Sequence, residues 1–291
     1  MQFGGTADET DSRAMYDACR AAGINFFDTA HVYTEGASET LLGRFIATER
    51  DRIIVATKAC YDRGASRANI LESLDDSRKR MGIDFIDLLY LHRWDADTPL
   101  EESFETLAGL RQSGRIGAIG VSNYAAWQVM KAQAVAARFD TRIDALQPMY
   151  NLVKRQAEVE LLPMAQDQGI EVFPYSPLGG GLLTGKYASG GEGRLSTDAR
   201  YSARYAQDWM HETARALADL AADNGIDAAT LAVAWAAGQP GVSAPIISAR
   251  NAAQLAPSLK ALTVPMPAEL EARITALSQK PAPATDRLEE A

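Results

Sequence analysis

Short runs of β-branched and aromatic residues alternate along this chain with longer amphipathic segments. A strand buried on both faces is a short, nearly continuous apolar run, whereas a helix that covers a sheet has apolar residues three or four positions apart. Alternation of the two is typical of βα units around a parallel sheet. We therefore expect seven strands, at residues 24–28, 53–58, 85–92, 116–122, 145–147, 171–175 and 244–248.

Helices are expected between these strands, and several of them have clear end signals. Gly23, Gly82, Gly114 and Gly169 each follow an amphipathic run and precede a strand. Glycine adopts the left-handed conformation of a helix C-cap at little steric cost. The expected helices cover residues 10–22, 38–47, 67–81, 100–113, 125–137, 156–168, 229–238 and 251–262.

The alternation runs through almost the whole chain without a linker, so we expect one domain over residues 1–291. Two features depart from it. A Gly-rich stretch at residues 179–204 is interpreted as a mobile functional loop, because insertions of that length in compact folds are usually lids or binding loops. Extra helices are expected at residues 208–224 and 267–277.

Charge and composition exclude several classes of function. The net charge of -9 argues against a protein that mainly binds nucleic acid or an anionic membrane surface, since both need basic faces. The two cysteines, Cys19 and Cys60, have no metal-ligand spacing and suggest no disulfide framework. No apolar run has the length of a membrane span, and the N-terminus does not resemble a signal peptide. We expect a soluble protein of the reducing cytoplasm, without a metal.

Polar residues stand at or just beyond the carboxyl ends of the expected strands. In a (β/α) barrel these ends converge at one mouth, where the active sites of this fold are found. A single such residue is unremarkable, because polarity usually returns where a strand ends. The set is the informative observation, and it consists of Asp28, Lys58, His92, Ser122 with Asn123, Gln147, Tyr175 and Ser248.

Three of these residues and one tyrosine have the chemistry of a proton-transfer site. Lys58 and His92 each follow a strongly apolar strand, so their side chains need partners, and Asp28 can supply the counter-charge to Lys58. Tyr33 lies five residues after Asp28, on the loop that leaves the first expected strand. Positive charge nearby makes a phenolic proton easier to transfer, which makes Tyr33 a candidate general acid.

Spaced motifs over most of the chain resemble the aldo-keto reductase family. They are GINFFDTAHVYTEGASETLLGRF, IIVATK, DLLYLH, GRIGAIGVSNY, LQPMYN, VFPYSPLGGGLLTGKY and PIISARNAAQL, in the order that the family has. The resemblance implies an α/β fold of the (β/α)8 TIM-barrel type. It also implies reduction of a small-molecule carbonyl by NADPH, with a catalytic tetrad at Asp28, Tyr33, Lys58 and His92. Tyr33 would protonate the carbonyl oxygen, and His92 would orient it.

The same resemblance implies a set of residues that bind the cofactor. Ser122, Asn123 and Gln147 would hold the nicotinamide carboxamide, and Tyr175 would stack on its ring. A guanidinium suits a phosphate, so Arg250 with Ser248 at the 2'-phosphate favours NADPH over NADH. Gln254 and Ser258 would lie at the adenine, and the pyrophosphate loop would include Ser176, Pro177, Leu178, Gly179, Leu183 and Lys186.

The chain also departs from the family pattern. Ser248 stands where the family often has glycine, and Ser258 where it often has asparagine, so contacts in that pocket differ in detail. The family usually begins with a short hairpin and a first barrel strand, whereas this sequence opens at MQFGG, just past them. We therefore expect an N-terminally short barrel that lacks its first strand, explained by a start codon placed too late, by trimming of the chain, or by a naturally short protein.

Other functions remain open at this stage. The GGLLTGKY segment is close to a phosphate-binding P-loop, but Tyr187 stands where such a loop needs Ser or Thr. No GxGxxG follows a strand, so a Rossmann dehydrogenase is unsupported. The main alternative is an NADPH-binding regulatory subunit with little turnover and a partner protein; a truncated, inactive barrel is another. Trp94 and Tyr61, on mouth-side loops, are expected to line the substrate pocket.

Overall fold

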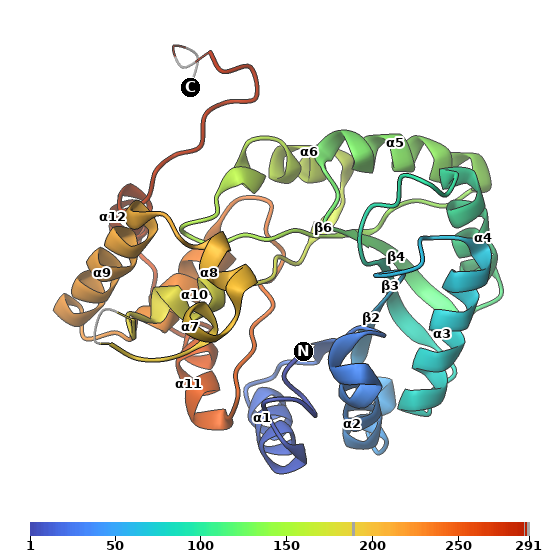
Figure 1. Cartoon of the computed structure of the whole chain (residues 1–291), viewed down its shortest axis with the longest axis horizontal. Helices are drawn as coiled ribbons and strands as arrows, with labels where there is room; N and C mark the ends of the chain where they lie inside the picture. Colours follow the sequence, from blue (N-terminus) through green and yellow to red (C-terminus); the bar gives the residue numbers. More distant parts are fainter. Residues whose placement is uncertain (188–189, 288, 290–291) are drawn as a thin grey trace. The chain divides into compact units, whose positions relative to one another are not determined.

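The computed structural model describes residues 1–187, 190–287 and 289 (Figure 1). The chain divides into two compact units. The first comprises Met1–Gln147 and Ser248–Leu255, and the second comprises Pro148–Ile247 and Ala256–Ala291. The prediction of one domain over residues 1–291 stays a prediction.

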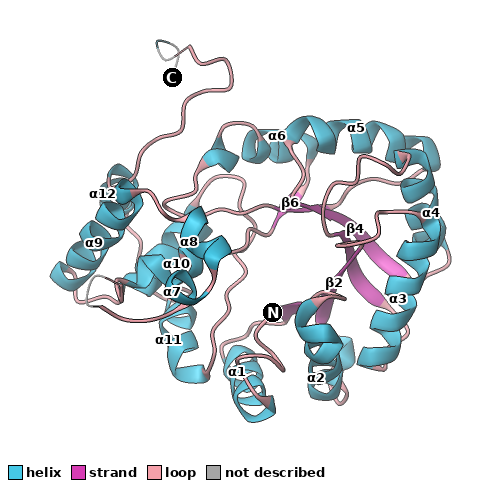
Figure 2. Ribbon diagram, in the orientation of Figure 1, coloured by secondary structure: helices cyan, strands magenta, loops and turns pink. Residues whose placement is uncertain are grey.

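The first unit is built on parallel strands in the spatial order β1-β2-β3-β4-β5, which is also their order in the sequence. Figure 2 shows the helices α2 to α5 along the outer side of this curved sheet. The strands and helices are α1 (Glu9–Ala21), β1 (Phe26–Asp28), α2 (Ala37–Ile46), β2 (Ile54–Ala59), α3 (Arg67–Met81), β3 (Ile86–Leu91), α4 (Leu100–Gln112), β4 (Ile116–Ser122), α5 (Ala126–Ala136) and β5 (Ala145–Gln147). Short 3-10 turns are η1 (Tyr33–Gly36), η2 (Arg50–Arg52) and η3 (Ala137–Phe139).

The second unit is mainly helical in its described part. It contains η4 (Gln156–Glu158), α6 (Leu161–Gln168), β6 (Glu171–Val172), η5 (Gly179–Thr184), α7 (Arg194–Thr197), α8 (Ala199–Arg204), α9 (Asp208–Asp223), α10 (Ala228–Gly238) and α12 (Ala268–Ala276). Helix α11 (Ala252–Lys260) begins in the last stretch of the first unit and ends in the second.

Local signals explain where several helices begin and end. The Ser66 side chain accepts a hydrogen bond from the Asn69 amide and caps the start of α3, which then runs to Met81 as expected. Gly82 closes that helix with a φ of 65°. The other three glycines predicted as stops, Gly23, Gly114 and Gly169, also have positive φ.

The central strands of the first unit are buried on both faces, as their nearly continuous apolar runs predict. Val55, Leu89 and Ile119, one from each of β2, β3 and β4, are fully buried. Gly120 of β4 is the register partner of Tyr90 on β3. A Cβ atom at Gly120 would overlap the Tyr90 ring, so the missing side chain leaves the room that the ring occupies.

Three sequence predictions need correction. Six strands, not seven, form in the described part of the chain, because residues 244–248 make only an isolated bridge from Ile246 to Tyr175. Pro245 in that segment has no N–H to donate to a ladder. The predicted helix at 156–168 is split, and Pro163 explains the break, since its ring would clash with the carbonyl four residues earlier.

The Gly-rich stretch at residues 179–204 is the third correction. We predicted a loop, but η5, α7 and α8 occupy much of its described part. Gly180 and Gly181 lie within η5 at φ of 67° and 95°, which kinks this turn between its two ends. The closed (β/α)8 barrel stays a prediction. Within the described residues, no helix combines the length and apolar character that crossing a membrane requires.

Substitution of Gly120 by alanine is expected to destabilise the protein by about 1–3 kcal/mol, because the new methyl group overpacks the buried Tyr90 ring. Gly109→Ala is the matched control: Gly109 lies in α4 with open space around its Cβ position, so the same change should stabilise by about 0.5–1 kcal/mol. Urea denaturation of the two variants measures the change in the free energy of unfolding of each, which should be a decrease for Gly120→Ala and an increase for Gly109→Ala. Equal stability of Gly120→Ala and the wild type would refute the close packing.

Candidate active site

A buried ion pair lies at the carboxyl ends of β1 and β2. The Lys58 ammonium group donates to Asp28 Oδ1 and, at 2.7 Å, to the main-chain carbonyl of Thr29. The Lys58 side chain is fully buried, and that of Asp28 is 7% exposed. The other carboxylate oxygen of Asp28 accepts a hydrogen bond of 2.9 Å from the Gln147 side-chain amide. The pair is therefore hydrogen-bonded on both sides, which a buried charge requires.

Lys58 remains a cation in this environment. Burial is the strongest single influence on its pKa and lowers it. The charges and hydrogen bonds of Asp28 and Tyr33 act in the opposite direction and together raise the pKa of Lys58 above its usual value. A permanent positive charge is thus held inside the first unit, next to a phenol.

Tyr33 and His92 complete the cluster that the sequence predicts. Tyr33 begins η1, and the Lys58 Nζ atom lies 5.0 Å from the centroid of its ring. The His92 imidazole follows β3 and meets the Tyr33 ring edge to face, at 5.7 Å between centroids and 77° between planes. The structure therefore brings together the four residues Asp28, Tyr33, Lys58 and His92.

The His92 side chain is neutral near pH 7. Burial, and then the positive charges of Lys58 and Arg93, lower the pKa of His92 from 6.5 to about 3. Its Nδ1 atom is buried and has no hydrogen-bond partner among residues 1–187, 190–287 and 289. A neutral imidazole has one N–H donor and one acceptor, so it can bind an oxygen atom without itself losing a proton.

A second ion pair, in which only the carboxylate is fully buried, supports the loop that carries Tyr33. Arg80 on α3 donates to the main-chain carbonyl of His31 at 2.8 Å and to Glu39 at 3.1 Å. The other carboxylate oxygen of Glu39 accepts from the Thr57 hydroxyl at 2.6 Å. Sequence reasoning missed this pair. The sequence feature that could have revealed it is a glutamate on the buried side of α2, because an uncompensated charge there is costly.

The residues predicted to hold the carboxamide are linked to one another at the ends of β4 and β5. The Asn123 side-chain amide donates to the Ser122 hydroxyl and to the main-chain carbonyl of His92, both at 3.0 Å. Ser122 in turn donates to the main-chain carbonyl of Gln147 at 2.9 Å. Asn123 has a φ of 59°, a left-handed conformation that asparagine tolerates better than most residues. These polar groups thus form a connected set beside His92.

Aromatic side chains lie on the loops after β2, β3 and β4 and at the start of α5. The predicted pocket residue Tyr61 packs against the His92 ring at 4.8 Å between centroids and is 44% exposed. The other predicted pocket residue, Trp94, contacts Tyr124 at 5.2 Å and Trp127 at 5.6 Å. Sequence reasoning missed Tyr124 and Trp127, which stand just after the Ser122–Asn123 pair.

The remaining residues predicted for the cofactor fall in both units. In the first, Arg250 is exposed and its guanidinium donates to Gln254 at 3.4 Å, at the start of α11; Ser248 is also exposed. In the second, Tyr175 bridges Met149 and Ile246, and the Ser176 carbonyl accepts from the Gly179 amide at 2.9 Å. The rest of that set in the second unit consists of Pro177, Leu178, Leu183, Lys186 and Ser258.

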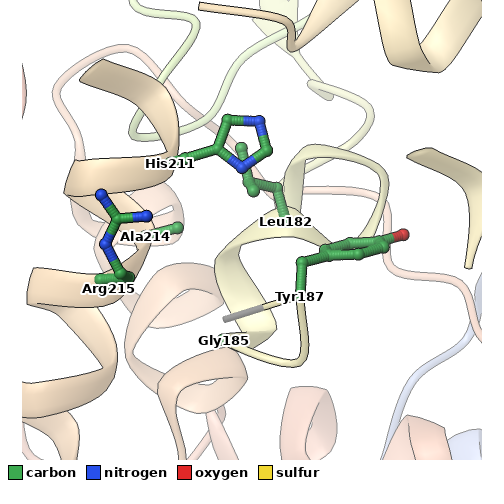
Figure 3. Close-up of a pocket in the computed structure, with 6 residues that line it drawn as sticks. All are labelled: Leu182, Gly185, Tyr187, His211, Ala214 and Arg215. Atoms are coloured by element: carbon green, nitrogen blue, oxygen red, sulfur yellow. The ribbon is translucent and has the colours of Figure 1, made fainter. Parts of the chain in front are cut away.

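Each unit has a cavity that no member of the tetrad lines. The one in Figure 3, in the second unit, has a volume of about 40 Å³, too small for a substrate, and is lined by Leu182, Gly185, Tyr187, His211, Ala214 and Arg215. A wider cleft of about 920 Å³ in the first unit involves α2, α3 and the residues before β2 and β3, so it lies at the opposite ends of these strands from Lys58 and His92. Neither cavity contains a member of the tetrad.

Comparison with known proteins identifies the family of this chain. The model of the aldo/keto reductase family matches residues 1–279, so the chain belongs to that family of oxidoreductases. A probable voltage-gated potassium channel subunit beta of Oryza sativa subsp. japonica is 35% identical over 286 residues, which cover 91% of this chain and 85% of that protein.

Two bacterial relatives are named as enzymes. The uncharacterized oxidoreductase YrpG of Bacillus subtilis is 34% identical over 93% of this chain and 87% of its own length. The L-glyceraldehyde 3-phosphate reductase of Escherichia coli is 32% identical over 89% of this chain and 81% of its own length. The relatives thus include both reductases and a channel subunit.

The pKa of His92 predicts a pH dependence of stability. The folded chain holds the His92 pKa at about 3, below the 6.5 of an ordinary histidine, so unfolding takes up a proton between these values. The stability is fully present above about pH 6.5 and falls by about 1.4 kcal/mol for each pH unit below it. His92→Gln should remove this loss. The free energy of unfolding in urea, measured from about pH 7 to about pH 4, tests this prediction. The same pH dependence in the wild type and in His92→Gln would contradict a buried neutral histidine.

Proposed function

We propose that this protein is an NADPH-dependent reductase of aldehydes or ketones, with Tyr33 as the general acid. The observation that carries the proposal is the contact of the Tyr33 ring with both the Lys58 ammonium group and the His92 imidazole. A cation beside a phenol favours the phenolate that remains after proton transfer. This is the property that a tyrosine acid needs at neutral pH, since its ordinary pKa is about 10.

Each residue of the cluster has a role in this reaction. When bound, NADPH supplies the hydride that adds to the carbonyl carbon. Tyr33 gives its hydroxyl proton to the carbonyl oxygen, and the neutral His92 positions that oxygen by a hydrogen bond. Lys58 stabilises the resulting phenolate, and Asp28 holds Lys58 in place through the buried ion pair. The product is an alcohol, and Tyr33 regains its proton from solvent.

Several features of the donor set fit a dinucleotide with a 2'-phosphate. Among the described residues no carboxylate makes an ion pair with the exposed Arg250, so its guanidinium is available to a phosphate. Ser258 has a buried hydroxyl without a hydrogen-bond partner in the part of the chain that the structure describes. A buried polar atom of this kind is costly unless a ligand satisfies it. The polar set of Ser122, Asn123 and Gln147 has the amide and hydroxyl groups that a carboxamide needs.

A second candidate function is supported by one of the relatives. The similarity to a probable voltage-gated potassium channel subunit beta suggests an NADPH-binding subunit that regulates a partner protein. The retained tetrad is compatible with both functions. Turnover separates them, because a regulator would bind NADPH without reducing any carbonyl at a useful rate.

Tyr33→Phe is expected to lower the rate of carbonyl reduction by about 10²–10⁴-fold, because it removes the proton donor. Oxidation of NADPH with a reactive aromatic aldehyde measures this rate. The Kd for NADPH should change little, since the ring that packs on His92 remains. Tyr16→Phe is the control: it also removes one hydroxyl, which hydrogen-bonds Glu49 away from the tetrad, and should leave the rate unchanged. Full activity of Tyr33→Phe would exclude Tyr33 as the acid.

Arg250→Met is expected to raise the Kd for NADPH about tenfold, because one charge-assisted contact with the phosphate is lost. The Kd for NADH should stay within about twofold, because NADH has no 2'-phosphate. Arg273→Met on α12 removes another exposed arginine and serves as the control. Quenching of intrinsic fluorescence by each cofactor gives the dissociation constants. An equal rise in the Kd for both cofactors would show that Arg250 does not bind the 2'-phosphate.

A further inference from the structure

Arg93 is a charged residue beside the tetrad to which neither the motifs nor the proposed reaction gives a role. It follows His92 directly, and its side chain is exposed. The guanidinium carbon lies 5.3 Å from the centroid of the Tyr61 ring, and that ring lies 4.8 Å from the His92 ring. The guanidinium and the imidazole are therefore separated by at most about 10 Å, which is the sum of these two distances. A ligand that contacts both groups therefore has to be short, on the scale of a single aromatic ring with its substituents.

Two charged groups on the loops next to Arg93 have partners of their own. Arg63, on the same loop as Tyr61, makes an ion pair of 3.0 Å with Glu72. The carboxylate of Asp95 accepts a hydrogen bond of 2.7 Å from the Ala65 amide. Within residues 1–187, 190–287 and 289, no carboxylate makes an ion pair with Arg93. Its guanidinium has planar donors that suit an oxyanion and are held in place by the Tyr61 ring.

The surface next to Arg93 is aromatic. Trp94 and Trp127 contact each other at 5.6 Å, and Tyr61 presents its ring between Arg93 and His92. Tyr61 and Trp127 are 44% and 61% exposed, so both rings have surface that a ligand can cover. Aromatic rings pack well on such a surface, whereas a small sugar or an aliphatic chain leaves much of it uncovered.

We propose that the substrate is an aromatic aldehyde that carries an oxyanion, and that Arg93 binds this anion while the ring packs against Tyr61 and Trp94. The proposal rests on the reductase function and names the substrate class of the same site. The net charge of -9 repels anions over the rest of the surface, so a local cation at the mouth has a large effect on which substrates enter. A carboxylate and a phosphate ester both have the required chemistry.

The test compares three aldehydes that share a benzene ring. 4-Carboxybenzaldehyde and 4-formylphenyl phosphate carry an anion, and methyl 4-formylbenzoate is the neutral isostere of the first. Arg93→Gln should lower kcat/KM for the anionic aldehydes by about tenfold or more, mainly through KM, because a charge-assisted contact is lost. The neutral ester should change by less than about twofold. The anion that loses more identifies whether carboxylate or phosphate is the better ligand.

Arg63→Gln is the matched control, because it removes an exposed arginine that is already paired with Glu72 of α3. All three aldehydes should keep their kcat/KM values in this variant. Equal losses for ester and acids in Arg93→Gln would assign Arg93 a purely structural role and overturn the proposal. Unchanged values for all three would overturn it as well.

A binding measurement separates failure of this proposal from failure of the reductase function. Trp94 and Trp127 lie beside the proposed ring site, so 4-carboxybenzaldehyde should quench tryptophan fluorescence, with a Kd about tenfold higher in Arg93→Gln. Such binding without turnover of any aldehyde would reject the reductase and keep the anion site. If the ester is reduced but the Kd of 4-carboxybenzaldehyde is the same in Arg93→Gln, the reductase function is kept and the anion site is rejected.

Discussion

The rest of the site depends on keeping the charge of Lys58 inside the protein. A buried ammonium group needs compensation for its lost hydration, and leaving one partner of such a pair alone costs about 3–5 kcal/mol. The chain meets this requirement with Asp28 and the Thr29 carbonyl, and Gln147 holds the far side of the carboxylate. Strands β1, β2 and β5 are thereby joined at their carboxyl ends, and Tyr33 is left facing a fixed cation.

The parts of the fold that were predictable are those set by local signals. The bounds of β4, β5 and α3 agree with the sequence expectation, because apolar runs and the Ser66 and Gly82 caps mark them. Residues 244–248 have a similar apolar composition, but whether they pair depends on hydrogen-bond geometry with a distant segment and on Pro245. The Gly-rich stretch was misjudged, since glycine permits a kinked turn as readily as an open loop.

For the site, the sequence showed which side chains stand at the strand ends but not how they are supported. The Thr29 carbonyl that binds Lys58 belongs to the main chain, so no residue type announces it. The Arg80–Glu39 pair links residues forty-one positions apart, and each is common on helix surfaces. No sequence motif includes Arg93. Its place against the Tyr61 ring, which only the structure shows, distinguishes it from other surface arginines such as Arg63, which is paired with Glu72.

The close approach of β3 and β4 at Tyr90 and Gly120 also bears on how this sequence can diverge. Every single-nucleotide change of a glycine codon that yields another amino acid introduces a Cβ atom, and the tyrosine ring occupies that space. The position accepts a larger residue without loss of stability only after the ring has become smaller. The two sites are therefore coupled in mutational order: a descendant of this chain reaches a side chain at position 120 by first losing the aromatic ring at position 90.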